Sequence, residues 1–193
     1  MERATHNLVR RLLDARNAAG HWEGRLASSA LSTATAVVAL SLTDRRRFDG
    51  LIAAGISWLA DHQNPDGGWG DTVLSLSNIS TTALAWAAFA VAAPGSYSAV
   101  ESRAEARLVL FAGTLDPHDL ALAISRRYGK DRTFAIPILT VLALAGKLGA
   151  GTDAWRRVTQ LPFELAAFPQ RWFHLLAQSW PLPPQGSLER RAR

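Results

Sequence analysis

The feature that most constrains this chain is an apolar run that ends in a glycine-rich turn. Residues 51–60 have the composition of a helix, and they lead through Gln63 into Asn-Pro-Asp-Gly-Gly at residues 64–68. Glycine adopts positive φ, proline fixes φ, and Asn and Asp bond the local backbone, so residues 64–68 predict a turn. Trp69 closes the turn, and a second apolar run follows at residues 80–88. The pattern therefore predicts a helical hairpin.

Two side chains are expected to hold this hairpin together. The Gln63 amide can bond the free carbonyl groups at the end of the first helix or the free N–H groups at the start of the second. The Trp69 ring can cover the corner between the helices, where a bare turn would stay wet. Both residues are therefore predicted to have structural roles.

A degenerate copy of the turn lies 47 residues earlier. Gly20 and Trp22 stand 47 positions before Gly67 and Trp69, whereas Arg16 takes the place of Gln63. An amphipathic helix from Leu8 to Ala15 precedes this copy. An arginine can donate to helix-end carbonyls, but unlike glutamine it cannot also accept.

The segments that follow the two tryptophans are alike as well. Residues 32–40 and 80–88 each open with hydroxyl residues, which are expected to be N-caps, and each continues as an apolar helix. A helix that is apolar all round is expected to be buried on both sides. Two helices per repeat of about 47 residues predict stacked hairpins in an all-α fold.

The turn resembles the QW motif of squalene–hopene and oxidosqualene cyclases. The matching residues are Gly55, Trp58, Leu59, Gln63, Gly67 and Trp69. Ala54 replaces the basic residue that often opens the motif. The resemblance implies that the hairpins belong to an α/α barrel (toroid), present here in part, because it covers only the N-terminal portion of such enzymes.

Later stretches extend the resemblance to roughly Leu8–Phe173. Pro162 and Glu164 match a Pro-x-Glu helix start of the family. The expected domains are a repeat domain at residues 1–176 and a Pro-rich and Arg-rich disordered tail at 177–193. Trp86, Trp172 and Phe173 are candidates to line a cavity, with packing in the core as the alternative.

Catalytic groups are not found in this sequence. The family protonates an alkene or epoxide with an Asp-x-Asp-Asp motif, in which clustered carboxylates keep one proton in place. No two aspartates here are adjacent or one residue apart, and the chain has no cysteine. The five histidines form no zinc-binding spacing. We therefore predict no catalytic, cofactor-binding or metal-binding residue. A glycoside hydrolase on this barrel needs two opposed carboxylates, for which Asp71 and Glu164 could be nominated, but nothing in the sequence marks them.

Charge and hydropathy bear on partners and location. The net charge is +5, but the arginines are spread along the chain, so no nucleic-acid partner is expected. No run approaches the roughly 18 apolar residues of a spanning helix, and the start lacks a signal-peptide pattern. We expect a cytoplasmic protein, or one peripheral on the cytoplasmic face of a membrane.

Two functions remain open at this stage. The first is the N-terminal segment of a squalene–hopene-type cyclase, which walls the cavity for an apolar polyprene such as squalene and works with a C-terminal cyclase half. The chain would then be a truncated, frame-shifted or split cyclase. The second is a non-catalytic helical-repeat module that binds a partner protein or a lipid.

Overall fold

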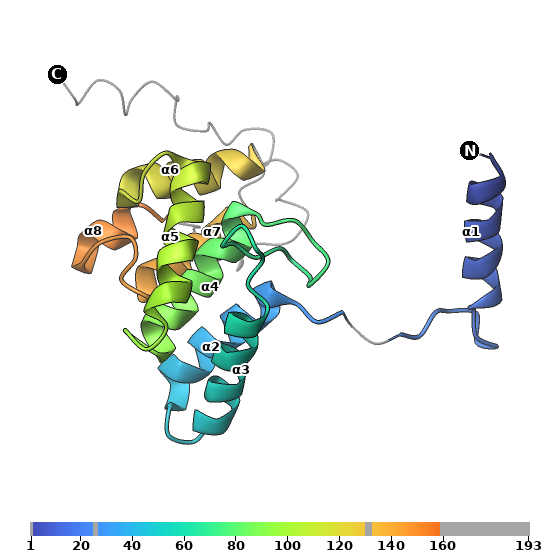
Figure 1. Cartoon of the computed structure of the whole chain (residues 1–193), viewed down its shortest axis with the longest axis horizontal. Helices are drawn as coiled ribbons and strands as arrows, with labels where there is room; N and C mark the ends of the chain where they lie inside the picture. Colours follow the sequence, from blue (N-terminus) through green and yellow to red (C-terminus); the bar gives the residue numbers. More distant parts are fainter. Residues whose placement is uncertain (1, 25–26, 130–132, 159–193) are drawn as a thin grey trace, which may run out of the picture. The chain divides into compact units, whose positions relative to one another are not determined.

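The structure, a computed structural model, describes residues 2–24, 27–129 and 133–158, and every regular element in these ranges is a helix (Figure 1). The helices are α1 (Glu2–Asp14), α2 (Ala30–Asp44), α3 (Asp49–Asp61), α4 (Ile79–Ala92), α5 (Ser98–Ala112), α6 (Pro117–Tyr128), α7 (Ala135–Leu144) and α8 (Gly151–Arg156). The predicted all-α class is confirmed.

The chain divides into two units, residues 1–158 and 159–193. The predicted domain boundary at residues 176 and 177 lies outside the described residues, and so do Pro162, Glu164, Trp172 and Phe173. All the helices given above belong to the first unit.

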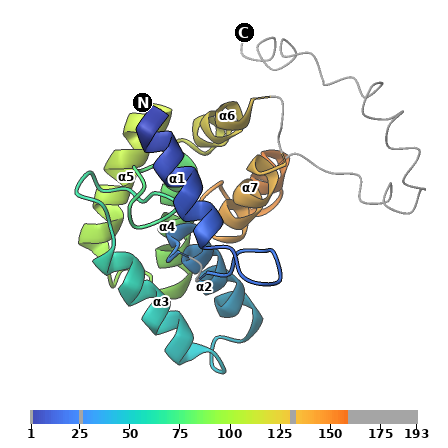
Figure 2. The same cartoon turned by 90° about the vertical axis from the view of Figure 1, so that its right-hand side faces the viewer.

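Helix α4 is the centre of the core. Helices α2, α3, α5 and α7 pack around it (Figure 2). Side chains on all its sides are buried, as its apolar sequence predicts. At its C-terminal end, Arg45 from the end of α2 donates to the carbonyl oxygens of Val91 and Ala92. A cation at this end of a helix is favourable because the helix dipole is negative there.

Helix α2 is less completely buried than its apolar sequence predicts. It is nearly as apolar as α4, yet only one stripe of it is buried, made by Ala30, Ala34, Val37 and Val38. The helices that pack most extensively on α2 are α3 and α4, whereas α4 also receives α5 and α7. The prediction that both helices are covered all round is therefore correct for α4 and wrong for α2.

The predicted N-caps are displaced toward the N-terminus. Ser29 caps α2 by accepting from the backbone N–H of Ser32, and Asn78 caps α4 by accepting from the N–H of Thr81. The hydroxyl residues expected as caps lie in the first turns of the helices instead. In α4 they are buried, where they bond other side chains and the preceding turn.

The bounds of α5 and α6 agree with their sequence patterns, whereas those of α1 and α7 differ from them. The sequence predicts a charged helix at residues 98–112 and another at about 117–128 with its cap at or next to Asp116, and α5 and α6 have these ranges. Asp116 caps α6 by accepting from the N–H groups of His118 and Asp119. Helix α1 begins at Glu2 rather than Leu8, because a polar first turn carries no apolar periodicity. The apolar run at residues 141–146 predicts a buried helix, and the observed helix α7 begins earlier, at Ala135, and ends at Leu144.

None of the described helices is by itself long and apolar enough to span a membrane. Helices α5 and α6 satisfy the length and composition criteria only when joined, across a bend of 66°.

Candidate functional site

The turn between α3 and α4 is built around Trp69. Its indole Nε1 donates to the carbonyl oxygen of Leu59 in the last turn of α3, at 2.9 Å. Its backbone N–H donates to the Thr82 hydroxyl in the first turn of α4, at 3.1 Å. The residue is only 1% exposed, and its ring lies 6.0 Å from the Phe89 ring. Trp69 thus joins the end of one helix to the start and body of the next.

Gln63 has different partners from those expected. Its amide nitrogen donates to the carbonyl oxygen of Gly67 within the turn, at 2.8 Å, and to that of Val100 in α5, at 3.0 Å. The predicted bonds to the end of α3 or the start of α4 are therefore wrong. The Leu59 carbonyl near the end of α3 accepts from Trp69 instead, and the Thr81 and Thr82 N–H groups of α4 bond Asn78. The Gln63 carbonyl oxygen is buried and has no partner among the described residues.

Gly67 brings the turn against α5. Its φ is +85°, a region that disfavours residues with a Cβ. A Cβ built there would lie 2.6 Å from the carbonyl oxygen of Arg103 in α5. Both the backbone conformation and the close approach require glycine.

An ion pair makes a further link from this turn to α5. The Asp66 carboxylate lies 3.1 Å from the guanidinium of Arg107, and that guanidinium lies over the Phe111 ring at 4.5 Å. Burial raises the pKa of Asp66, but the Ser77 hydroxyl, the Gly68 N–H and Arg107 together lower it below its ordinary value. This carboxylate is therefore ionised at neutral pH.

Polar side chains fix the loop between Trp69 and α4. The Asp71 carboxylate accepts from the Asn78 amide at 2.9 Å and from the Thr81 hydroxyl at 2.7 Å. The Asn64 amide donates to the carbonyl of Ser75 and to the Ser77 hydroxyl. Asp71, the acid considered for a glycoside hydrolase, thus lies in a cluster of polar side chains that orders the loop.

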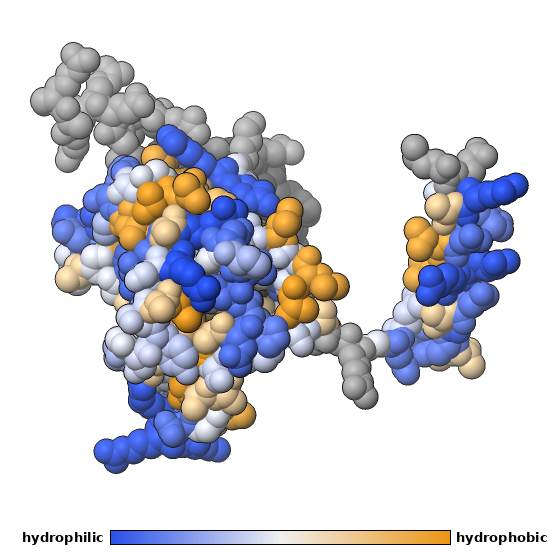
Figure 3. Space-filling view, in the orientation of Figure 1, coloured by the Kyte–Doolittle hydropathy of each residue, from blue (hydrophilic) through white to orange (hydrophobic). Residues whose placement is uncertain are grey.

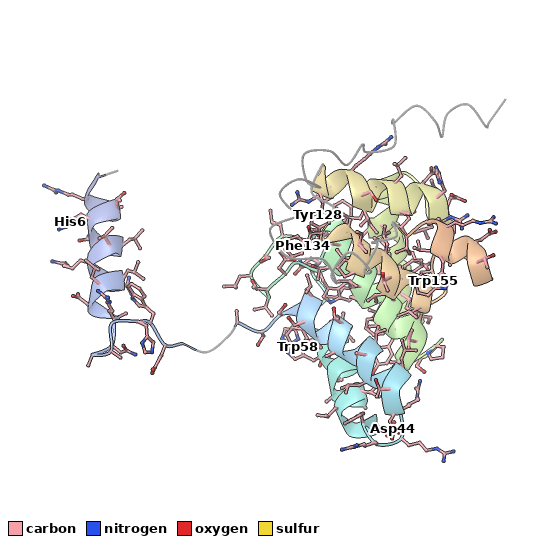
Figure 4. All side chains as sticks on the ribbon, turned by 180° about the vertical axis from the view of Figure 1, so that it is seen from behind. His6, Asp44, Trp58, Tyr128, Phe134 and Trp155 are labelled. Carbon is pink, nitrogen blue, oxygen red and sulfur yellow. The ribbon has the colours of Figure 1, made fainter. Side chains whose placement is uncertain are left out.

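Ser80 extends these polar contacts to α6. The Tyr128 hydroxyl donates to the Ser80 hydroxyl at 2.9 Å, and the Tyr128 ring packs at 6.0 Å from that of Phe134 (Figure 4). Buried hydroxyls need such partners because an unpaired polar group is costly in a core.

The earlier turn, predicted as a degenerate copy, repeats two of these side-chain hydrogen bonds. The indole of Trp22 donates to the carbonyl of Leu12 at 2.6 Å, and Arg16 donates to the carbonyl of Gly20 at 2.6 Å. The Gly20 φ is +85°, as at Gly67. The prediction that Arg16 bonds the end of the helix is wrong, because it bonds the turn as Gln63 does.

The remaining residues of the pattern shape α3. Gly55 allows α2 and α3 to approach closely, since a Cβ there would lie 2.5 Å from a methyl group of Val37. Leu59 is fully buried, and Trp58 stacks on His62 with ring centroids 4.1 Å apart (Figure 4). Each position therefore has a packing role that can be stated from the contacts.

Trp86, a predicted candidate for cavity lining, is bonded at its ring edge and covered on its face. Its indole N–H donates to the Glu105 carboxylate at 3.1 Å, and Lys147 Nζ lies 3.7 Å from the ring centroid. Burial lowers the pKa of Lys147, and the opposing charges of Glu101 and Glu105 raise it in part. These contacts tie α4, α5 and the turn after α7 together. Nothing in the sequence pattern had pointed to this cluster, since its members are far apart in the chain.

Three acidic side chains near the turn and in α5 have hydrogen-bond partners. The carboxylates of Asp66, Asp71 and Glu105 all accept hydrogen bonds from neighbouring side chains. Within the described ranges, no group of three or more His, Asp or Glu side chains is arranged to hold a metal ion.

Comparison with known proteins identifies the family. The model of the squalene-hopene cyclase N-terminal domain matches residues 5–113, more than half of the chain. Searches of curated proteins and of solved structures gave no significant match. The family match spans both turns described above and the helices α2 to α5 that surround them. This chain therefore belongs to the squalene-hopene cyclase N-terminal domain family.

Proposed function

We propose that this chain is the N-terminal, cavity-walling part of a squalene–hopene-type triterpene cyclase. Its substrate class is an apolar polyprene such as squalene, and a C-terminal cyclase half supplies the acid that starts cyclisation. The observation that carries this proposal is the match of residues 5–113 to the cyclase N-terminal family.

The apolar helices support a role at the wall of a hydrocarbon cavity. A polyprene offers almost no hydrogen-bonding groups, so its pocket needs apolar walls of fixed shape. Helix α4 is apolar and buried on all its sides, so it forms the packed core behind such a wall. The contacts of Gln63, Trp69 and Asp66 with neighbouring helices hold that core in place. We propose that these turn residues, which resemble the QW motif, keep the wall rigid during cyclisation.

The charges of the turn support the proposal that the catalytic acid comes from the C-terminal half. Protonating an alkene requires a carboxylic acid that stays protonated, and burial or a neighbouring carboxylate is what raises a pKa in this way. The pKa of Asp66 is lowered instead, and Arg107 favours its ionised form. Asp66 is therefore poorly suited to donate a proton to a hydrocarbon.

The substrate class also bears on location. Squalene-like hydrocarbons partition into bilayers, and a basic surface is attracted to anionic lipid head groups. The net charge of +5 suits a protein of the cytoplasm that binds the membrane peripherally. We include this location in the proposal.

One observation favours a second function, a helical-repeat module that binds a protein or a lipid. The loop before α4 exposes Val73, Leu74 and Leu76, and the two leucines are 94% and 92% exposed. Figure 3 shows hydrophobic colour over this loop. Since Asn64 and Thr72 hold the loop in shape, these aliphatic side chains form a fixed apolar surface.

Squalene turnover distinguishes the two functions. The purified chain is incubated with squalene alone and together with a C-terminal cyclase half that carries an Asp-x-Asp-Asp motif. We expect cyclised product only in the mixture, and none when the motif aspartates of that half are replaced by asparagine.

Two other outcomes would contradict the proposal. Product from the chain alone would show that it carries its own acid. No product in either incubation, although the two proteins form a complex, would favour the binding module. The variant Leu74→Ser/Leu76→Ser would then be expected to weaken that complex.

A further inference from the structure

Helix α1 has an apolar side that is exposed. Leu8, Val9, Leu12 and Leu13 are between 50% and 65% exposed. Figure 3 shows their side of the helix in hydrophobic colour, with hydrophilic residues on the other. Four large aliphatic side chains on one side of a helix usually have a packing partner.

The two turns identify which residues of the first hairpin correspond to those of the second. The bonds Trp22 to Leu12 and Arg16 to Gly20 repeat Trp69 to Leu59 and Gln63 to Gly67, 47 residues apart in each case. By the same spacing, Val9 and Leu12 of α1 correspond to Ile56 and Leu59 of α3. Those two residues of α3 are 3% and 0% exposed.

The N-caps show which residues of α2 correspond to which residues of α4. Ser29 and Asn78, the N-caps of α2 and α4, are 49 residues apart, because the loop after Trp22 is two residues shorter than the loop after Trp69. Thr33, Ala36 and Leu40 of α2 therefore correspond to Thr82, Ala85 and Phe89 of α4.

In the second hairpin these positions form the side of α4 that meets its own turn. Trp69 donates to the Thr82 hydroxyl and packs against Phe89. Thr82, Ala85 and Phe89 are all 0% exposed. In α2, by contrast, Ala36 is exposed and Thr33 and Leu40 are only partly buried.

We propose that α1 packs against this side of α2 in the same chain and closes the first hairpin as α3 closes the second. Val9 and Leu12 cover Ala36, and the Trp22 ring lies on Leu40. The backbone N–H of Trp22 donates to the Thr33 hydroxyl. The proposed contact joins two apolar surfaces, because α2 carries no charged residue between Ala30 and Thr43. This packing does not depend on the proposed cyclase function.

Cysteine labelling tests the proposal cleanly because the chain has no natural cysteine. The variant Ala36→Cys places one thiol under the proposed contact, and Arg46→Cys places a reference thiol in the exposed turn after α2. We expect maleimide to label the thiol at position 36 more slowly than the reference thiol at position 46, by a factor on the order of ten or more. Equal labelling rates would overturn the proposal.

A matched pair of variants in α1 checks that this helix provides the cover. Val9→Asp in the Ala36→Cys chain is expected to raise the labelling rate at position 36 to that of the reference thiol. Arg10→Asp, on the neighbouring polar position, is expected to leave it slow. If the two variants act alike, α1 is not the cover.

Two further results would assign the exposed side of α1 to another occupant and so contradict the proposal. Protection of the thiol at position 36 that appears only as the protein concentration rises would mean that α1 packs on a second copy. Protection that appears only with vesicles containing anionic lipid would mean that α1 binds a membrane.

Discussion

The indole nitrogen of Trp69 and the carbonyl oxygen of Leu59, ten residues apart in the chain, are joined by a 2.9 Å hydrogen bond inside the core. Trp22 and Leu12 form the same bond in the first hairpin, where Trp22 is 48% exposed. The same hydrogen bond thus joins the turn to the preceding helix in both hairpins.

The first prediction concerns this bond. Trp69→Phe keeps an aromatic ring but leaves the buried Leu59 carbonyl without its partner. We expect a loss of about 1–3 kcal/mol in the free energy of unfolding. Trp155→Phe is the control, and its loss should be smaller because that ring is 45% exposed. Equal losses in urea denaturation would contradict the prediction.

The second prediction separates backbone strain from steric contact. Gly67 and Gly95 both have positive φ, at +85° and +74°. A Cβ at Gly67 would meet the Arg103 carbonyl oxygen, whereas one at Gly95 would meet nothing within 4 Å. Each alanine substitution should cost about 1–2 kcal/mol in strain. Gly67→Ala should cost more than Gly95→Ala, as measured by thermal unfolding.

The third prediction tests the close approach of α2 and α3. Gly55→Ala would bring a methyl group against Val37, and overpacking of this kind typically costs about 1–3 kcal/mol. Val37→Ala removes the opposing methyl groups, so the double variant should lose less stability than the two single losses added together. A coupling energy of at least about 0.5 kcal/mol is expected in a double-mutant cycle. Simple additivity would mean that the helices move apart instead.

The fourth prediction concerns pH. The folded-state pKa of Asp66 lies below its ordinary value of 3.8, so the unfolded chain binds the proton more tightly. The stabilisation from Asp66 is therefore fully present above about pH 4 and is lost as the pH falls through the folded pKa.

Asp66→Asn gives the measurement. The stability difference between wild type and this variant should be constant near neutral pH and should shrink below about pH 4. A difference that stays constant down to about pH 2 would show that the charge of Asp66 makes no contribution. Arg107→Gln should reduce the same pH dependence, because it removes the partner of the carboxylate.

Local patterns in the sequence predicted the elements well where the signal is itself local. Pro117 after Asp116 and Gly129 after Tyr128 mark the ends of α6, because capping depends on residues next to each other. The Asn-Pro-Asp-Gly-Gly turn and its earlier copy were predicted for the same reason. The residue type at each position largely determines the backbone there.

Contacts between distant residues could not be predicted in this way. The residue type of Gln63 suggests a hydrogen bond to a helix end. Its partner in α5, the Val100 carbonyl, could not be predicted because it depends on where α5 lies. The cluster of Trp86, Glu105 and Lys147 likewise requires three elements to meet. The apolar sequence of α2 predicted burial, yet burial depends on which neighbours cover the helix.

The bond from Gln63 to Val100 has a consequence for the order in which the chain folds during synthesis. The acceptor lies 37 residues after the donor, so the turn between α3 and α4 leaves the ribosome before α5 does. Until then the Gln63 amide has only its bond to Gly67 within the turn. The second hairpin can therefore form early, but its turn is completed only when α5 arrives. Each new element would then secure the one made before it, and folding would proceed in the direction of translation.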